Sequence, residues 1–347
     1  MSREPLLSIQ NLTVEFATDD GIVRAVTDVS YDVFAGETLG IVGESGSGKS
    51  VSMLSVLGLI PSPPGRIVGG EAYFKGRNLI DMRAGDLRRI RGGDAAMIFQ
   101  DPMTSLNPVL RIGNQIAEAI KTHQPSIKDK AARDRSIELL RLVGVPNPDQ
   151  RYDQYPHEFS GGMRQRGMIA MAIANSPSLL IADEPTTALD VTIQAQILEV
   201  LKAAQEETHA ATILITHDLG LVAELADRVA VMYAGRVVEL GDVHTIFANP
   251  RHPYTIGLME SLPRLTGEDD EWLQPIPGSP PSLISVPPGC AFHPRCFLSQ
   301  GRAKCRQEVP PLRQIGTGVH LSACHFAEEL EGRTGLTAAP AVPEQTT

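Results

Sequence analysis

The chain has 347 residues, of which 42% are hydrophobic and 21% charged, and its formal net charge is −10. The length allows one large domain with an extension, or two domains, and the acidic balance speaks against nucleic acid as the main partner. No apolar run approaches the ~20 residues that span a bilayer, and the N-terminus, residues 1–5, lacks the apolar core of a signal peptide. We therefore expect a cytoplasmic protein, and docking on a membrane protein stays open.

The N-terminal part of the chain predicts a small antiparallel sheet. Residues 8–16 and 25–33 are typical of two strands, and Asp19-Asp20-Gly21 between them is a turn signal. Phe16 on the first strand could present its ring to an adenine base. The alternative is an ordinary strand aromatic that packs in a core.

A phosphate-binding pattern follows this sheet. Residues 43–50 read G-x-x-x-x-G-K-S, between an apolar segment at 38–42 and a segment at 51–57 that can start a helix. A strand, a glycine-rich turn and a helix N-terminus aim several backbone N–H groups at one point, which favours an anion there. We expect Lys49 to reach the β- and γ-phosphates of a nucleotide, and the Ser50 hydroxyl to ligate Mg²⁺. A chance match is the alternative, and the flanking segments argue against it. The expected nucleotide-binding residues here are Gly43, Glu44, Ser45, Gly46, Ser47, Gly48, Lys49 and Ser50.

The next stretch begins with short elements and then becomes helical. After a Gly- and Pro-rich loop at 60–70 we expect a strand at 71–74, a short basic helix or turn at 86–91, and a strand at 95–99 that ends at Gln100. Residues from about 101 to 160 show helical periodicity with no clear strand. We interpret them as an inserted helical subdomain.

Three further segments end in residues suited to phosphate chemistry. Ser160-Gly161-Gly162 opens a predicted helix that runs to about residue 175, with Ser160 as its N-cap. The apolar strand 179–184 ends in Asp183, suited to Mg²⁺, and Glu184, which can accept a proton from water. A strand at 212–216 ends at His217, on the edge where parallel sheets bind ligands. Each signal is weak alone, since a capped helix, two solvated carboxylates and a structural histidine are the alternatives.

Beyond a predicted closing hairpin at 228–240 the composition shifts. Twelve of the 26 prolines and all four cysteines lie in residues 261–347, and the spacing C-x5-C-x8-C-x18-C fits neither a zinc finger nor the ferredoxin patterns. Four thiols in a cytoplasmic chain favour a metal centre, with unligated or merely buried cysteines as the alternative, and nearby histidines keep zinc open. Residues 328–347 are predicted to be disordered. The thiols are Cys290, Cys296, Cys305 and Cys324, and the histidines are His293, His320 and His325.

With these motifs in this order, the chain resembles the nucleotide-binding subunit of an ABC transporter over about residues 6–260. Gln100 matches the Q-loop glutamine, Ala188-Leu189-Asp190 matches the D-loop, and Phe16 falls where the adenine-stacking aromatic is expected. The signature, residues 159–166, reads F-S-G-G-M-R-Q-R, with Met163 where glutamine is commoner. The implied fold is α/β: a P-loop NTPase core with a small antiparallel β-subdomain, an inserted helical subdomain and a Cys/Pro-rich C-terminal extension.

The resemblance also implies a mechanism. Two cassettes packed head to tail would each contribute the Ser160 hydroxyl, the Gly162 backbone and the signature-helix N-terminus to the ATP held by the other. Glu184 would act as general base, while His217 holds the γ-phosphate and the water in line. Gln100 would sense the γ-phosphate. The implied catalytic residues are Glu184, His217, Gln100 and Lys49.

The C-terminal sequence narrows the resemblance to oligopeptide and dipeptide importer ATPases. Residues 249–255 and 290–296 look like their C-terminal extension, Arg91-Gly92 and residues 99–108 also match, and the similarity reaches about residue 327. Members with four such cysteines resemble proteins that hold a structural [4Fe-4S] cluster there. The resemblance further implies ATP, Mg²⁺, two membrane permease subunits and a second ATPase subunit, with a heterodimer favoured over a homodimer. It implies an extracellular binding protein reached indirectly, and a peripheral location at the cytoplasmic face of the cell membrane.

Two other functions stay open from the sequence. A nickel or other small-solute importer of the same subfamily would share every motif, because the ATPase never touches the cargo. A soluble ABC ATPase acting in DNA repair, on chromosomes or on ribosomes belongs to a different class. Such proteins usually have two cassettes in one chain or long coiled coils, and neither pattern is present here.

Overall fold

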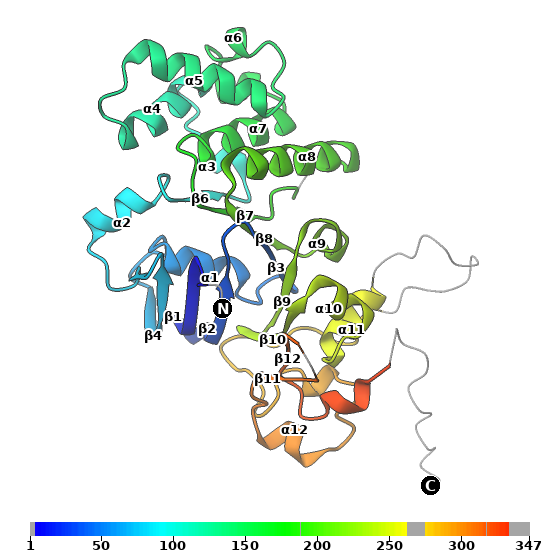
Figure 1. Ribbon diagram of the computed structural model, residues 1–347. Coiled ribbons are helices and arrows are strands. Elements are labelled where there is room, and N and C mark those ends of the chain that lie inside the picture. Colours follow the sequence, from blue (N-terminus) through cyan, green and yellow to red (C-terminus); the bar gives the residue numbers. More distant parts are fainter. Residues whose placement is uncertain (1–3, 188, 262–274, 317, 333–347) are drawn as a thin grey trace, which may run out of the picture.

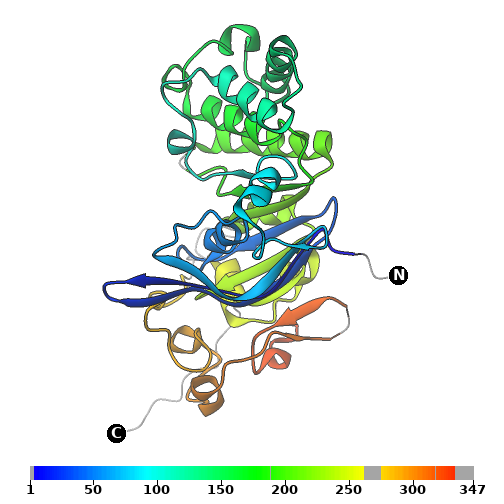
Figure 2. The same ribbon diagram turned by 90° about the vertical axis from the view of Figure 1, so that its left-hand side faces the viewer.

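The computed structural model describes residues 4–187, 189–261, 275–316 and 318–332. The helices of residues 102–208 gather at one end of the molecule, two sheets with further helices lie in the middle, and the C-terminal extension lies at the opposite end (Figure 1). The view turned by 90° shows the same three levels (Figure 2). None of the described helices combines the length and the apolar character needed to cross a membrane.

The smaller sheet is antiparallel and confirms the two predicted N-terminal strands. Its third strand begins earlier than expected, at Gly65, inside the stretch that we predicted as a loop at 60–70. The glycine is there because the strand packs on an aromatic ring: a Cβ at Gly65 would come within 2.8 Å of Cε1 of Phe16. The strand order is β2 (Gly21–Val33), β1 (Leu7–Thr18), β4 (Gly65–Phe74) and β5 (Arg77–Asn78).

The larger sheet contains five neighbouring parallel strands, which extend from its centre to one edge. Its order is β11 (Arg313–Gln314), β12 (His320–Ser322), β10 (Arg236–Asp242), β9 (Arg228–Tyr233), β3 (Thr38–Val42), β8 (Ala211–Thr216), β7 (Leu179–Asp183) and β6 (Ala95–Ile98). The strands from β9 to β6 run parallel, and β10 pairs antiparallel with β9.

This sheet separates two hydrophobic cores because successive side chains of a strand point to opposite faces. Leu179 and Ile181 of β7 pack with the smaller sheet, whereas Leu180 and Ala182 pack with the helices. All residues of β3, β7 and β8 are buried, as expected for parallel strands covered on both faces.

Helices fill the segment between β6 and β7, where the described residues contain no strand. The signature helix ends at Ala172, slightly before the predicted end near residue 175. The helices are α1 (Lys49–Val56), α2 (Ala84–Ile90), α3 (Pro102–Ser105), α4 (Ile112–His123), α5 (Asp129–Leu142), α6 (Pro148–Arg151), α7 (Gly161–Ala172), α8 (Val191–Thr208), α9 (Leu219–Leu225), α10 (Val243–Ala248), α11 (Pro253–Glu260) and α12 (Ala303–Gln307), with 3₁₀ turns η1 (Pro156–Glu158), η2 (His293–Arg295) and η3 (Ala327–Leu330).

The C-terminal extension shares the main sheet with the core. Strand β12 pairs antiparallel with β10, and Nε2 of His320 lies 2.8 Å from Oε1 of the fully buried Glu239. Disorder from residue 328 was a wrong prediction for residues 328–332. Leu330 is fully buried, because η3 returns it to the protein interior after the strands. Residues 333–347 lie outside the described part of the chain.

Candidate nucleotide site

The P-loop, residues 43–50, closes tightly between β3 and α1. Gly43 has φ +154° and Gly48 has φ +99°, in the region that L side chains rarely adopt. A Cβ on Gly43 would lie 2.2 Å from the carbonyl oxygen of Met232, and one on Gly48 would lie 2.3 Å from that of Ala25. Both positions therefore require glycine for conformation and for space.

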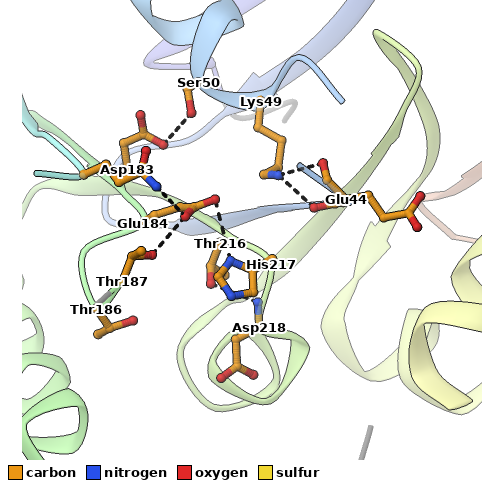
Figure 3. A network of polar contacts seen from close by, with 12 residues as sticks. Glu44, Lys49, Ser50, Asp183, Glu184, Thr186, Thr187, Thr216, His217 and Asp218 are labelled. Carbon is orange, nitrogen blue, oxygen red and sulfur yellow. Dashed lines mark hydrogen bonds and ion pairs between the residues drawn. The ribbon is translucent and has the colours of Figure 1, made fainter. Parts of the chain in front are cut away.

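Lys49 lies inside this loop (Figure 3). Its Nζ donates to the carbonyl oxygens of Gly43 at 2.7 Å and Glu44 at 3.1 Å. Burial lowers the pKa of Lys49, and the carboxylates of Glu184, Asp183 and Glu44 oppose that shift. The ammonium group bonds directly to neutral carbonyls, so a phosphate entering the loop would gain a charge-assisted hydrogen bond.

Ser50 and Asp183 provide two oxygen ligands beside the loop. Oγ of Ser50 donates to Oδ1 of Asp183 at 2.7 Å, and burial raises the pKa of this 5% exposed carboxyl group. A hydroxyl and a carboxylate are ligands that Mg²⁺ accepts, so the residues fit this ion. Among the described residues no three His, Cys, Asp or Glu side chains are grouped to hold a metal ion.

Glu184 is the centre of a second cluster of polar side chains. Its Oε2 accepts hydrogen bonds from Nε2 of Gln100 and from Oγ1 of Thr187, both at 2.9 Å, and its Oε1 lies 3.6 Å from Nδ1 of His217. Glu184 has φ +44°, a strained backbone state that costs about 1–3 kcal/mol and that clusters at functional sites. The surrounding contacts thus hold this carboxylate in a conformation that it would not adopt alone.

The two clusters meet because the parallel strands end at one edge of the sheet. The P-loop follows β3, Gln100 follows β6, Glu184 follows β7 and His217 follows β8. The carboxyl edge of a parallel sheet is where open α/β folds bind ligands.

Other expected site residues lie apart from these clusters. Phe16 is partly buried in β1 against the core of the smaller sheet. Ser160 N-caps α7 by accepting from the backbone N–H of Met163 at 3.3 Å, and it is exposed at the helical end of the molecule. Ala188 of the predicted D-loop lies outside the described residues.

The sequence interpretation missed two residues that hold the P-loop. The Glu44 carboxylate points away from Lys49 (Figure 3) and forms an ion pair with Arg295 at 2.7 Å. The backbone N–H of Glu44 donates to the Tyr254 hydroxyl at 2.8 Å. Both residues stand in segments that we quoted for the subfamily resemblance, but their contacts cross more than 200 positions, as the separations of 210 and 251 residues show.

Comparisons with known proteins agree with this geometry. The ABC transporter family matches residues 26–187, and the oligopeptide/dipeptide transporter C-terminal region matches residues 238–305. The chain is 55% identical over 326 residues to the dipeptide transport ATP-binding protein of Bacillus subtilis, covering 94% of this chain and 96% of that protein. It is 51% identical over 331 residues to the Escherichia coli dipeptide transport ATP-binding protein, covering 95% and 99% of the two chains.

A solved structure extends the likeness to three dimensions. It is a dimeric ATP-binding cassette bound to ADP and Pi, with a TM-score of 0.62 and 26% identity over 68% of this chain and 98% of that one. The two dipeptide transport proteins, at 55% and 51% identity, match this chain along nearly their whole length. The chain therefore belongs to the ABC transporter family, with the ATP-binding subunits of the oligopeptide and dipeptide transporters.

Proposed function

We propose that this chain is the ATP-hydrolysing subunit of an ABC importer that energises uptake of di- and oligopeptides across the cytoplasmic membrane. The observation that carries the proposal is the convergence of the P-loop, the Ser50–Asp183 pair and Glu184 at one sheet edge, in a chain that also has the C-terminal region of peptide transporters. ATP hydrolysis needs phosphate ligands, Mg²⁺ ligands and a base, and we assign these three roles to residues at this edge.

The hydrolytic step follows from the positions of the side chains. Lys49 and the P-loop N–H groups would bind the β- and γ-phosphates, and Ser50 with Asp183 would hold Mg²⁺, which neutralises charge that develops on the phosphates. Glu184 would accept the proton of the attacking water, and His217, with 61% of its side chain exposed, would orient that water. Gln100, bonded to Glu184, would report the γ-phosphate to the helices that follow it.

A second cassette would complete each nucleotide site. The exposed Ser160 and the N-terminus of the 12-residue helix α7 offer a hydroxyl, backbone N–H groups and a helix dipole to an ATP held by another chain. We favour a related chain over a second copy as this partner. In the Glu184→Gln background and with the partner cassette supplied, Mg·ATP should produce a cassette dimer that light scattering detects. Ser160→Arg should prevent that dimer and leave ATP binding by the single chain intact.

The remaining partners follow from the importer role. We expect two membrane permease subunits that bind the chain at the cytoplasmic face of the cell membrane, an extracellular substrate-binding protein reached only through them, and no nucleic acid. The decisive experiment reconstitutes the chain with its permeases and partner cassette in vesicles and measures ATP-driven uptake of a labelled dipeptide. Uptake of nickel without dipeptide uptake would move the protein to a nickel importer, and ATPase activity without binding to permeases would indicate a soluble ABC ATPase.

We also propose that Cys290, Cys296, Cys305 and Cys324 hold a structural [4Fe-4S] cluster. The four thiols border one small cavity. Burial raises the pKa of Cys290 to about 11 and that of Cys324 to about 12, so both are neutral thiols at neutral pH unless a metal binds them. The backbone N–H of Phe326 lies 3.4 Å from Sγ of Cys324, a bond of the kind that tunes iron–sulfur ligands.

Zinc is the weaker alternative for this cavity. One zinc ion would need four ligands at about 2.3 Å. His320 and His325 have oxygen partners at Glu239 and at the carbonyl of Glu308. Anaerobically purified protein should be brown, with near-stoichiometric iron and sulfide, whereas zinc without iron would overturn the assignment.

A further inference from the structure

We propose that Arg295 is a positioning residue for the nucleotide site, which fixes the P-loop through Glu44 so that the C-terminal extension sets the affinity for Mg·ATP. The proposal rests on the ATP site proposed above. It adds a part of the chain that lies outside the sheet edge and outside the segment of residues 26–187 matched by the ABC transporter family.

The contact between Arg295 and Glu44 is bidentate and largely shielded from water. Nη1 of Arg295 lies 2.7 Å from Oε2 of Glu44, and Nη2 lies 3.0 Å from Oε1. The arginine side chain is 6% exposed and the glutamate side chain 26%. Paired, charge-assisted hydrogen bonds of this kind fix geometry, and losing one partner leaves a poorly solvated charge.

The arginine is itself held from the other sides. Its Nε donates to the carbonyl oxygen of Pro277 at 2.9 Å, and Nη1 also lies 3.4 Å from the Tyr233 hydroxyl. Its guanidinium carbon lies 5.8 Å from the ring centroid of Tyr233 and 5.9 Å from that of Phe292. These contacts on several sides fix the guanidinium group, so it can hold the Glu44 carboxylate in one position.

A cluster of three aromatic rings also connects the C-terminal extension to the core. The ring centroids of Tyr233 and Tyr254 are 4.6 Å apart, and the Phe292 ring lies 5.2 Å from Tyr233 and 5.4 Å from Tyr254. Tyr254 also accepts the backbone N–H of Glu44. The clamp on the P-loop therefore has two contacts, the Arg295 guanidinium on the Glu44 side chain and the Tyr254 hydroxyl on its backbone.

Glu44 joins the clamp to Lys49. Its side chain bonds to Arg295, its N–H to Tyr254 and its carbonyl oxygen to Nζ of Lys49. The backbone N–H groups of the rest of the P-loop follow Glu44 directly in the chain. A shift of this residue would therefore displace both the loop N–H groups and the lysine that we expect to contact phosphate.

The clamp also borders the cysteine cavity. Arg295 precedes Cys296 directly, and Phe292 lies two residues after Cys290 and lines the cavity with both. We therefore expect the loading of this cavity to be linked to nucleotide affinity, because both depend on the conformation of residues 290–296. Protein stripped of its metal should bind Mg·ATP more weakly than loaded protein, even when no hydrolysis is measured.

The test is a double-mutant cycle on the purified full-length chain, with the Kd for Mg·ATP measured by calorimetry. Arg295→Met and Glu44→Gln should each raise the Kd about tenfold, which is about 1.4 kcal/mol and within the net contribution of one hydrogen bond to the nucleotide. The double variant should bind no more weakly than the worse single variant, since both changes break one contact. Arg133→Met is the matched control: it breaks a bidentate pair with Asp153 among the helices, away from both the P-loop and the cysteines, and should leave the Kd within about twofold.

The outcomes separate this inference from the proposed function. Wild-type protein that fails to bind Mg·ATP would overturn the ATP site itself. If the wild-type chain binds and Lys49→Ala does not, while the Arg295 and Glu44 variants bind as tightly as wild type, only the clamp is wrong. If Arg295→Met does not fold, the double variant Arg295→Met/Glu44→Gln decides, because it removes the contact and leaves neither charge buried without its partner. In the assembled transporter the clamp variants should raise KM for ATP more than they lower kcat, which a general loss of stability would not do.

Discussion

Glu184→Gln gives the sharpest test of the hydrolytic site. The two bonds that orient the side chain, from Gln100 and Thr187, both reach Oε2, and an amide oxygen at that position can accept both. The positive φ of +44° costs about the same free energy for glutamine as for glutamate. The fold should therefore change in stability by less than about 1 kcal/mol.

The expected loss lies in the chemical step. A glutamine amide cannot take the proton of the attacking water, and a positioned general base contributes about 10²–10⁴ in rate, or about 3–5 kcal/mol of barrier. Binding should not weaken, because the substitution removes one negative charge close to the expected triphosphate. Loss of that repulsion leaves the Kd for Mg·ATP equal to or lower than that of the wild-type chain.

The assay compares single-turnover phosphate release with nucleotide binding in the reconstituted transporter. Glu206→Gln, an exposed change of the same type on α8, serves as the matched control and should hydrolyse at the wild-type rate. Hydrolysis by Glu184→Gln at the wild-type rate would refute the role of Glu184. A parallel loss of binding and hydrolysis would show that the carboxylate supports the fold of the site rather than the reaction.

Three further predictions concern particular side chains. Burial lowers the pKa of His252 to about 3, so below pH 6.5 the unfolded chain binds a proton that the folded chain does not. The free energy of unfolding therefore decreases as the pH drops, by about 2 kcal/mol at pH 5. His252→Asn should remove this decrease in acid-unfolding curves, whereas the exposed control His244→Asn should not. Ser50→Ala breaks the bond to Asp183 and should abolish the dependence of nucleotide affinity on Mg²⁺, measured by calorimetry with and without chelator; an unchanged Mg²⁺ dependence would count against the ion site. Gly43→Ala places a Cβ 2.2 Å from the Met232 carbonyl oxygen and should lower Tm and prevent ATP binding, whereas Gly85→Ala, with open space around it, should do neither.

The sequence predicted those features of the fold and the site that depend on patterns among residues close together in the chain. The strands, the P-loop and the residues after β6, β7 and β8 were predictable because strand alternation and glycine spacing are local properties, and parallel strands bring their carboxyl ends together. The predicted loop at 60–70 was wrong from Gly65 onward. Glycine usually indicates a loop, but here it makes room for an aromatic ring that packs against the strand. The contact of Arg295 with Glu44 was out of reach, since its two residues are 251 positions apart and nothing local marks an arginine as a partner of a P-loop glutamate.

The roles of Ser160 and of the cysteines could not be derived from local sequence patterns. Ser160 is exposed, and we expect its ligand to be bound by another polypeptide. The four cysteines come from separate segments, with Cys305 in α12, and these segments meet through tertiary packing, so spacing alone could not match the cysteines to a known motif.

The pairing of β12 with β10 has a practical consequence for anyone who shortens this chain. Cutting the protein after residue 261 would remove β12 and leave one side of β10 with unpaired backbone N–H and C=O groups, and such an edge recruits strands from other molecules. A truncated protein would therefore aggregate, and its inactivity would not test the role of the cysteines or of the nucleotide site. Single substitutions at the cysteines keep the pairing of β12 with β10 and test that role directly.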